Sequence, residues 1–160
     1  MFRSFAITSE VKEMADEWSE FIGNKHSIRK DGGNRKIGDY AEVIFWRMYP
    51  DARRISDKDR NADFVLKNKR IDVKAADRNG PINGEYECNI EHRQKDFEVD
   101  FYAFFSFNKK AGLMEFGGWI SKQEFFDKAR LIRKGWKRPD NGWVCSADCW
   151  TLAYKFLHRE

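Results

Sequence analysis

The sequence predicts an α/β fold in which helices flank a central mixed β-sheet. Three observations support this class: apolar residues at helical spacing near the N-terminus, alternation over residues 63–76, and a nearly continuous apolar run at Phe101–Phe107. A run of that kind is typical of a strand buried on both faces. With 160 residues, of which 41% are hydrophobic, the chain fits one domain with one well-buried core. We therefore treat residues 1–160 as a single domain with an N-terminal helix and a basic-aromatic C-terminal extension.

Two helices are predicted before the alternating region. The first has Thr8 or Ser9 as its N-cap, and its apolar face comprises Val11, Met14, Ala15, Trp18 and Ile22. The second has Pro50 as a stop signal, and its apolar stripe comprises Ala41, Ile44, Phe45 and Met48. Glu42 lies at the edge of this stripe, where a solvated surface glutamate is the ordinary explanation.

The polar stretch between these helices, residues 23–36, contains five basic residues, one acidic residue and three glycines. It predicts a flexible basic loop. Such a loop could follow a phosphate backbone, because lysine and arginine beside adaptable glycine backbone suit that contact. A solvated linker explains the same composition, and the sequence does not separate the two interpretations.

The alternating region predicts a β-hairpin. Asp63–Lys67 and Arg70–Ala76 both alternate, and Asn68 with Lys69 suits a tight turn between them. Directly opposed residues share a face of the sheet. The expected pairs are Lys67 with Arg70, Leu66 with Ile71, Val65 with Asp72, Phe64 with Val73, and Asp63 with Lys74.

This pairing separates an apolar face from a polar one, and the polar face carries Asp63, Val65, Lys67, Arg70, Asp72 and Lys74. The two carboxylates become diagonal neighbours, close enough to share one cation. Two acids with nearby carbonyl oxygens suit a hard divalent cation such as Mg²⁺, and an adjacent lysine can orient water. A cross-strand Asp–Lys salt bridge on a solvated face is the alternative.

Asp63 followed by Asp72-Val73-Lys74 resembles the PD-(D/E)XK nuclease superfamily, whose fold is restriction-endonuclease-like. Ala62 replaces the proline that often precedes the first aspartate. The family also tends to carry a glutamate on a preceding helix, shortly after a glycine, and Gly38-Asp-Tyr-Ala-Glu42 matches this in order and spacing. The resemblance implies an αβββαβ-type core with a central mixed sheet flanked by helices.

The resemblance also implies the roles of the site residues. Asp63, Asp72 and the Val73 carbonyl would hold Mg²⁺ or Mn²⁺, and Glu42 would bind the metal or position the attacking water. Lys74 would position that water and stabilise charge on the phosphate. Nucleases of this kind often place a glutamine after the following strand, so Gln94 becomes a further catalytic candidate, although a surface turn explains it equally well.

Elements after the hairpin complete the predicted order. Residues 85–90 and 101–107 predict strands, and Leu113–Ile120 predicts another. A capping box at Ser121–Glu124 opens a helix whose inner face would comprise Phe125, Ala129 and Ile132.

Basic residues predict a polyanionic partner. The net charge of +4 is modest, but the basic residues cluster at 25–36, 67–70 and 133–138. Trp136 and Trp143 lie within or beside the last cluster and could stack on bases, although core packing is the competing explanation. The candidate DNA contacts are Lys36, Lys67, Lys69, Arg70, Arg133, Lys134, Lys137 and Arg138.

The cysteines and the hydropathy pattern bear on location. Cys88, Cys145 and Cys149 form an odd set that suits reducing surroundings, and Cys145-x3-Cys149 completed by Cys88 or His158 is a weak zinc pattern. No apolar run is long enough to span a membrane, and the N-terminus lacks a signal-peptide core. We expect a cytoplasmic protein with no membrane association and no nucleotide cofactor.

Taken together, these patterns predict a metal-dependent DNA endonuclease. Two alternatives stay open: a Holliday-junction resolvase-like nuclease that acts on branched DNA as a homodimer, and a non-catalytic nucleic-acid-binding module of the same fold. The complete set of Glu42, Asp63, Asp72 and Lys74 favours activity.

Overall fold

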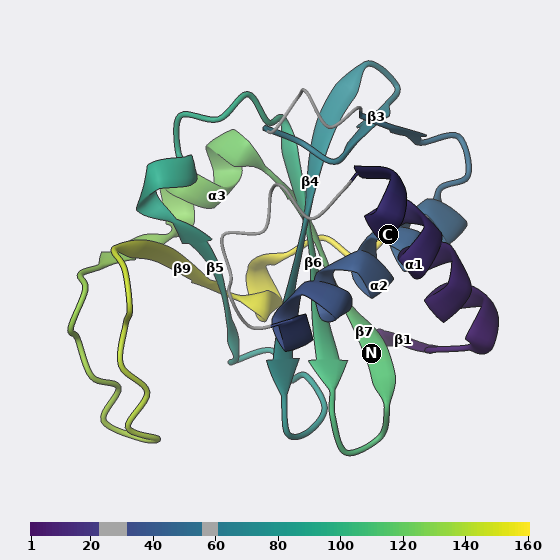
Figure 1. Cartoon of the computed structure of the whole chain (residues 1–160). Coiled ribbons are helices and arrows are strands. Elements are labelled where there is room, and N and C mark those ends of the chain that lie inside the picture. The colour runs from purple at the N-terminus through teal and green to yellow at the C-terminus, as the bar shows by residue number, and fades with distance from the viewer. Residues whose placement is uncertain (23–31, 56–60) are drawn as a thin grey trace.

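The computed structural model describes residues 1–22, 32–55 and 61–160 and has a mixed α/β fold with two sheets (Figure 1). The small sheet has the order β5-β9-β8 and consists of β5 (Glu87–Glu91), β8 (Arg130–Ile132) and β9 (Cys149–Ala153). The large sheet has the order β1-β7-β6-β4-β3-β2 and consists of β1 (Arg3–Ala6), β2 (Arg53–Arg54), β3 (Phe64–Leu66), β4 (Lys69–Arg78), β6 (Phe101–Asn108) and β7 (Leu113–Ser121).

Helices cover the large sheet on one face, and the small sheet lies against the other. Helices α1 (Ser9–Ile22) and α2 (Gly32–Met48) pack on the first face, as Figure 1 shows, while α3 (Lys122–Lys128) packs beside the small sheet. Two short 3-10 turns, η2 (His92–Gln94) and η3 (Tyr154–Phe156), complete the described elements. The mixed sheet with flanking helices confirms the predicted α/β class.

Strand β6 lies between two hydrophobic cores. Ala103 and Phe105 face the helices α1 and α2, whereas Tyr102 and Phe104 face α3 and the small sheet. All four side chains are at most 2% exposed. The nearly continuous apolar run over this strand therefore has the two-sided burial that the sequence predicts.

The predicted hairpin is present, but its register differs from the prediction. The turn residues are Lys67 and Asn68, both with positive φ (51° and 63°), and Leu66 pairs with Lys69 and Phe64 with Ile71. Positive φ at both central residues marks the turn type whose twist matches a hairpin, and this moves the turn one residue toward the N-terminus. The pairing shifts by two residues, so each side chain stays on its predicted face.

The strand after the hairpin leaves the large sheet. The expected strand at residues 85–90 corresponds to β5, but β5 pairs with β9 in the small sheet. Strand β4 pairs instead with β6, in parallel, over eight residue pairs from Ile71↔Phe101 to Arg78↔Asn108. Parallel strands need a long crossover connection, and the segment containing β5 and η2 supplies it.

Helix boundaries confirm some predictions and correct others. Thr8 is the N-cap of α1, since its Oγ1 accepts from the Val11 N–H at 3.2 Å. Helix α2 begins at Gly32, so residues 32–36 are helical and do not belong to the predicted basic loop. Residues 23–31 and the side chain of Ile22 lie outside the described part of the chain.

The predicted helix after the capping box is shorter than expected. Ser121 Oγ accepts from the Glu124 N–H at 3.1 Å, which confirms the N-cap. The helix ends at Lys128 because Ala129 turns to an extended backbone, and Ile132 belongs to β8. Of the predicted inner face, Phe125 is fully buried on the helix. In the described residues, no helix is long and apolar enough to cross a membrane.

Candidate active site

Four side chains from α2, the start of β3 and β4 lie together at the hairpin, and we call Glu42, Asp63, Asp72 and Lys74 the acidic cluster. Asp63 lies directly before β3 and is held against β4, because its backbone N–H donates to the Ile71 carbonyl at 2.9 Å. Its Oδ2 accepts from the Val73 N–H at 2.8 Å. The observed register, continued by one residue, brings Asp63 level with Asp72 instead of diagonal to it.

Asp72 and Lys74 alternate on β4 and form an ion pair. The Lys74 Nζ lies 3.0 Å from Asp72 Oδ2, and both side chains are largely buried. Burial by itself lowers the pKa of Lys74, but the charges of Asp72 and Asp63 outweigh it and leave that pKa above its ordinary value. Lys74 is therefore held as a cation.

The carboxylates destabilise one another's charged form. Burial raises the pKa of Asp63 well above its ordinary value, and the charges of Glu42 and Asp72 add to this, while Lys74 opposes it. Burial likewise raises the pKa of Glu42 to about 7, with a further contribution from Asp39. Hydrogen bonding from Asp63 partly offsets this rise in the pKa of Glu42. The raised pKa values thus favour the protonated forms of Glu42 and Asp63 relative to ordinary carboxyls.

Arg54 on β2 is a cationic neighbour of this cluster that the sequence analysis did not single out. Its Nη2 lies 4.0 Å from Glu42 Oε2, and its guanidinium stacks over Trp18 at 3.9 Å. Its charge partly offsets the raised pKa of Glu42. Nothing in the local pattern around Arg53-Arg54 indicates this role, because the contact depends on how β2 joins the sheet edge.

The oxygen donors of the cluster fit a hard divalent cation in chemistry. Carboxylates are its preferred ligands, and a cation between them would offset the burial and the repulsion that raise the pKa values of Glu42 and Asp63. In the described residues, however, no group of three or more histidine, cysteine or carboxylate side chains is arranged to hold a metal. The oxygens instead contact Lys74, Arg54 and the Val73 N–H.

Gln94 lies on η2, which follows β5, and its side chain is half-buried. Among the described residues, no hydrogen bond joins its side chain to the acidic cluster. Glu91, three residues earlier, does influence the acidic cluster, because its negative charge contributes to the raised pKa of Lys74. The sequence analysis missed Glu91. Its only local signal was its position just before the segment that contains Gln94.

Four of the predicted DNA-contacting residues lie on the β3–β4 hairpin or on α2. Lys67 and Lys69 are exposed at the hairpin tip, and Lys36 is exposed on α2. Arg70 has structural contacts: its N–H donates to Asp100 Oδ2 at 2.8 Å and its Nε to the Glu98 carbonyl at 2.6 Å.

The remaining basic candidates lie on a hairpin arm, residues 133–148, which extends from the small sheet (Figure 1). Lys137 pairs with Val144 across the arm. Trp136 and Trp143 are 37% and 40% exposed, so neither is a core residue. Lys134 is also exposed.

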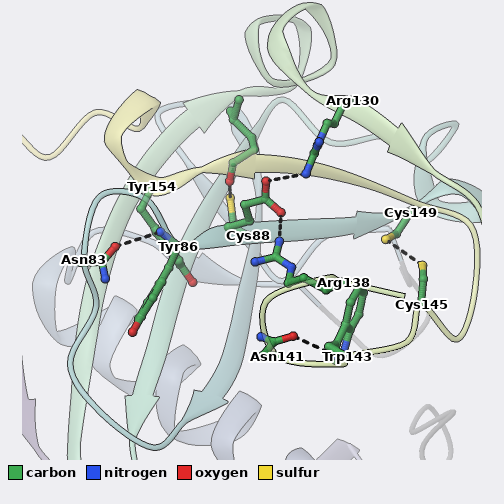
Figure 2. Close-up of polar contacts among 12 residues, drawn as sticks. Asn83, Tyr86, Cys88, Arg130, Arg138, Asn141, Trp143, Cys145, Cys149 and Tyr154 are labelled. Atoms are coloured by element: carbon green, nitrogen blue, oxygen red, sulfur yellow. Dashed lines mark hydrogen bonds and ion pairs between the residues drawn. The ribbon is translucent and has the colours of Figure 1, made fainter. Parts of the chain in front are cut away.

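Two arginines of the arm are bound by acids. Arg133 contacts Asp148 at 3.1 Å. Arg138 pairs with Glu87 on β5, which also contacts Arg130 at 3.2 Å, as Figure 2 shows. The arm is therefore fastened to the small sheet through Glu87.

The cysteines do not form the zinc site that the sequence suggested. Cys145 and Cys149 approach to 3.5 Å between their sulfur atoms (Figure 2), and burial raises the pKa of Cys149 to about 12. Cys88 lies in a different hydrophobic cluster, where its thiol donates to the Leu152 carbonyl. His158 contacts Glu124 at 2.9 Å. Among the described contacts, neither Cys88 nor His158, the proposed additional ligands, reaches the pair.

Comparisons with known proteins leave the geometry as the basis for assignment: no protein-family model matches the chain, and no curated protein matches it.

Proposed function

We propose that this protein is a metal-dependent DNA endonuclease of the PD-(D/E)XK type, with a restriction-endonuclease-like fold. One observation carries the proposal: Glu42 from α2, Asp63 from the start of β3, and Asp72 with Lys74 from β4 interact electrostatically in a largely buried site. A solvated salt bridge on a sheet face would not bring a helix glutamate into the same group. The mixed sheet is compatible with this type of nuclease.

The chain supplies oxygen ligands and one fixed cation to the proposed reaction. Glu42, Asp63, Asp72 and the Val73 carbonyl would hold Mg²⁺ or Mn²⁺. When bound, such a cation polarises a phosphodiester and lowers the pKa of a coordinated water. Lys74 stays protonated beside Asp72, so it would orient the attacking water and offset negative charge on the phosphate. Gln94 is a weaker candidate for orienting water or phosphate.

The substrate we propose is DNA, held through its phosphates. The exposed lysines Lys67 and Lys69 would follow the backbone at the hairpin tip, Lys36 would contact it from α2, and Lys134 and Lys137 would do so along the arm. Arg70, Arg133 and Arg138 are weaker candidates, because each already has an acidic or carbonyl partner.

A non-catalytic DNA-binding module is the second candidate. It is favoured by the contacts that already occupy the cluster, namely Lys74 on Asp72, Arg54 near Glu42, and the Val73 N–H on Asp63. Such a module would bind DNA equally well with or without a divalent cation.

The test is cleavage of a labelled panel of single-stranded, linear duplex, flapped and four-way-junction DNA in Mg²⁺, Mn²⁺ or EDTA. Wild type is compared with Lys74→Ala and with the control Lys109→Ala, which removes an exposed lysine paired with Asp77 at 3.4 Å. Metal-dependent cutting that is lost only in Lys74→Ala supports the nuclease. Binding without cutting on every substrate would favour the non-catalytic module, and a preference for the four-way junction by a dimer would identify a resolvase-like activity.

A further inference from the structure

The Tyr102 hydroxyl is buried beside the acidic cluster without a hydrogen-bond partner. Tyr102 lies on β6 and is 1% exposed. Within the part of the chain that the structure describes, its hydroxyl oxygen contacts no donor or acceptor. Leaving a buried hydroxyl unpaired costs stability, so such a group in a native fold calls for a physical explanation.

The strand register places this residue next to Asp72. In the parallel pairing of β4 with β6, Asp72 is opposite Tyr102 and Lys74 is opposite Phe104. Opposed residues share a face of the sheet, so the phenol and the Asp72 carboxylate project to the same side. The ring is packed by Phe104, Phe125 and Phe126, with centroid distances of 6.0, 5.6 and 6.4 Å.

The Asp72 carboxylate is largely buried and has an ionic partner on one of its oxygens. One of its oxygens is held by Lys74 at 3.0 Å, and Asp72 is 7% exposed, so little water reaches it. Carboxylates that ligate metals are typically hydrogen-bonded by outer partners, which orient them. The hydroxyl of Tyr102, the register partner of Asp72, is a donor that the described contacts leave unused.

We propose that Tyr102 is a positioning residue for Asp72: when Asp72 binds a divalent cation, the phenol donates a hydrogen bond to the carboxylate oxygen that faces away from it. The proposal rests on the proposed function, since it requires a cation at the acidic cluster. Because the hydroxyl is buried, it acts through Asp72 and does not touch the DNA. The phenol thus has its partner only in the cation-bound state.

The test compares Tyr102→Phe with Ser106→Ala. Ser106 lies on the same strand and face, is fully buried, and also has a hydroxyl without a described partner. Its register partner is Ala76 instead of an acid, so it is a matched control. Three quantities are measured for each protein: the thermal midpoint in EDTA, the Mn²⁺ dissociation constant by calorimetry, and the Mn²⁺ concentration that half-saturates cleavage.

We expect Tyr102→Phe to weaken Mn²⁺ binding by about 10- to 100-fold, the usual range for losing an outer partner of a metal ligand. Cleavage should recover at high Mn²⁺, and the midpoint in EDTA should not fall, since no hydrogen bond is lost without metal. Ser106→Ala should bind Mn²⁺ as wild type does.

Three results would overturn the inference. The first is an unchanged Mn²⁺ affinity in Tyr102→Phe, the second is an equal loss in Ser106→Ala, and the third is a lowered midpoint of Tyr102→Phe in EDTA. If wild type binds Mn²⁺ and Asp72→Asn does not, these results leave the proposed metal site standing. If wild type itself binds no divalent cation, the proposed function fails and this inference fails with it.

Discussion

The acidic cluster and the arm both carry charged residues, but they differ in how those charges are compensated. In the cluster, burial and mutual repulsion raise the pKa values of Glu42 and Asp63, and Lys74 is the counter-charge at shortest range. In the arm, Arg133 and Arg138 each pair with one acid. The comparison teaches that several like charges buried together perturb one another's protonation, whereas a charge with one opposite partner is compensated, whether it is exposed as in Arg133 or half-buried as in Arg138.

The largest expected effect comes from Asp72→Asn, which removes a cluster charge and keeps the side-chain shape. Cleavage should fall by at least about 1000-fold, because a cation contributes several kcal/mol of charge stabilisation. DNA binding, measured by fluorescence anisotropy, should change little. Asp77→Asn on the same strand, where the aspartate pairs with exposed Lys109, is the control and should cut normally. Full activity of Asp72→Asn would contradict the proposal that the acidic cluster, unlike the arm, takes part in catalysis.

The next largest effect is a pH dependence of stability that only the cluster should show. Glu42 has a pKa raised from 4.5 to about 7 in the fold, so its neutral form is favoured by folding. A raised carboxyl pKa stabilises the fold fully below the unfolded value, and this contribution is lost as pH rises through the folded value. We expect the free energy of unfolding in EDTA to fall by about 2–3 kcal/mol between about pH 4.5 and 8.

Glu42→Gln isolates this contribution. The thermal midpoint of this variant should change less with pH than that of wild type over the same range, because glutamine does not titrate. In wild type, Mg²⁺ should raise the midpoint more at pH 8 than at pH 5, since it binds the ionised carboxylates. Parallel pH profiles for the two proteins would contradict the assignment of the raised pKa to Glu42.

A smaller effect is expected from the arm, on DNA affinity. Lys134→Ala with Lys137→Ala should lower affinity several-fold and reduce the slope of log K against log salt by about 1 per lysine. The rate of cleavage at saturating DNA should not change. The control double variant, Lys12→Ala with Lys110→Ala, removes the same charge from exposed positions outside the arm. An equal loss in the control would mean that only net charge matters.

The smallest effect should come from releasing the arm. Glu87→Gln removes the carboxylate that holds Arg130 and Arg138, and we expect a loss of about 1 kcal/mol, as for partly exposed ion pairs. Limited proteolysis should cut residues 133–148 faster in this variant. The matched control is Glu85→Gln, because Glu85 forms an exposed ion pair with Lys155. This variant should leave the rate of proteolysis unchanged.

Several parts of the site could be predicted from local pattern. Alternation with period two decided which hairpin residues share a face, and this survived a two-residue error in register. The apolar stripe predicted the helix that carries Glu42. The capping residues Thr8 and Ser121 were also predictable, because a cap depends on atoms only three residues apart.

Other contacts lay outside the reach of the sequence because they join distant segments. Arg54 meets Glu42 only because β2 adds to the sheet edge, and Glu91 influences Lys74 only because β5 leaves for the small sheet. Tyr102 is an ordinary member of an aromatic run until the parallel register sets it opposite Asp72. None of these three has a local signal of its role.

The sequence by itself determined the α/β class, the composition of each hairpin face and the candidate residues for a cation site, since these follow from side-chain chemistry and short-range periodicity. Tertiary structure alone decided the hairpin register, the partner of β5 and the neighbours that shift the pKa values of the cluster. The physical reason is distance along the chain. Periodicity acts between residues a few positions apart, whereas desolvation and charge coupling depend on which remote segments pack together.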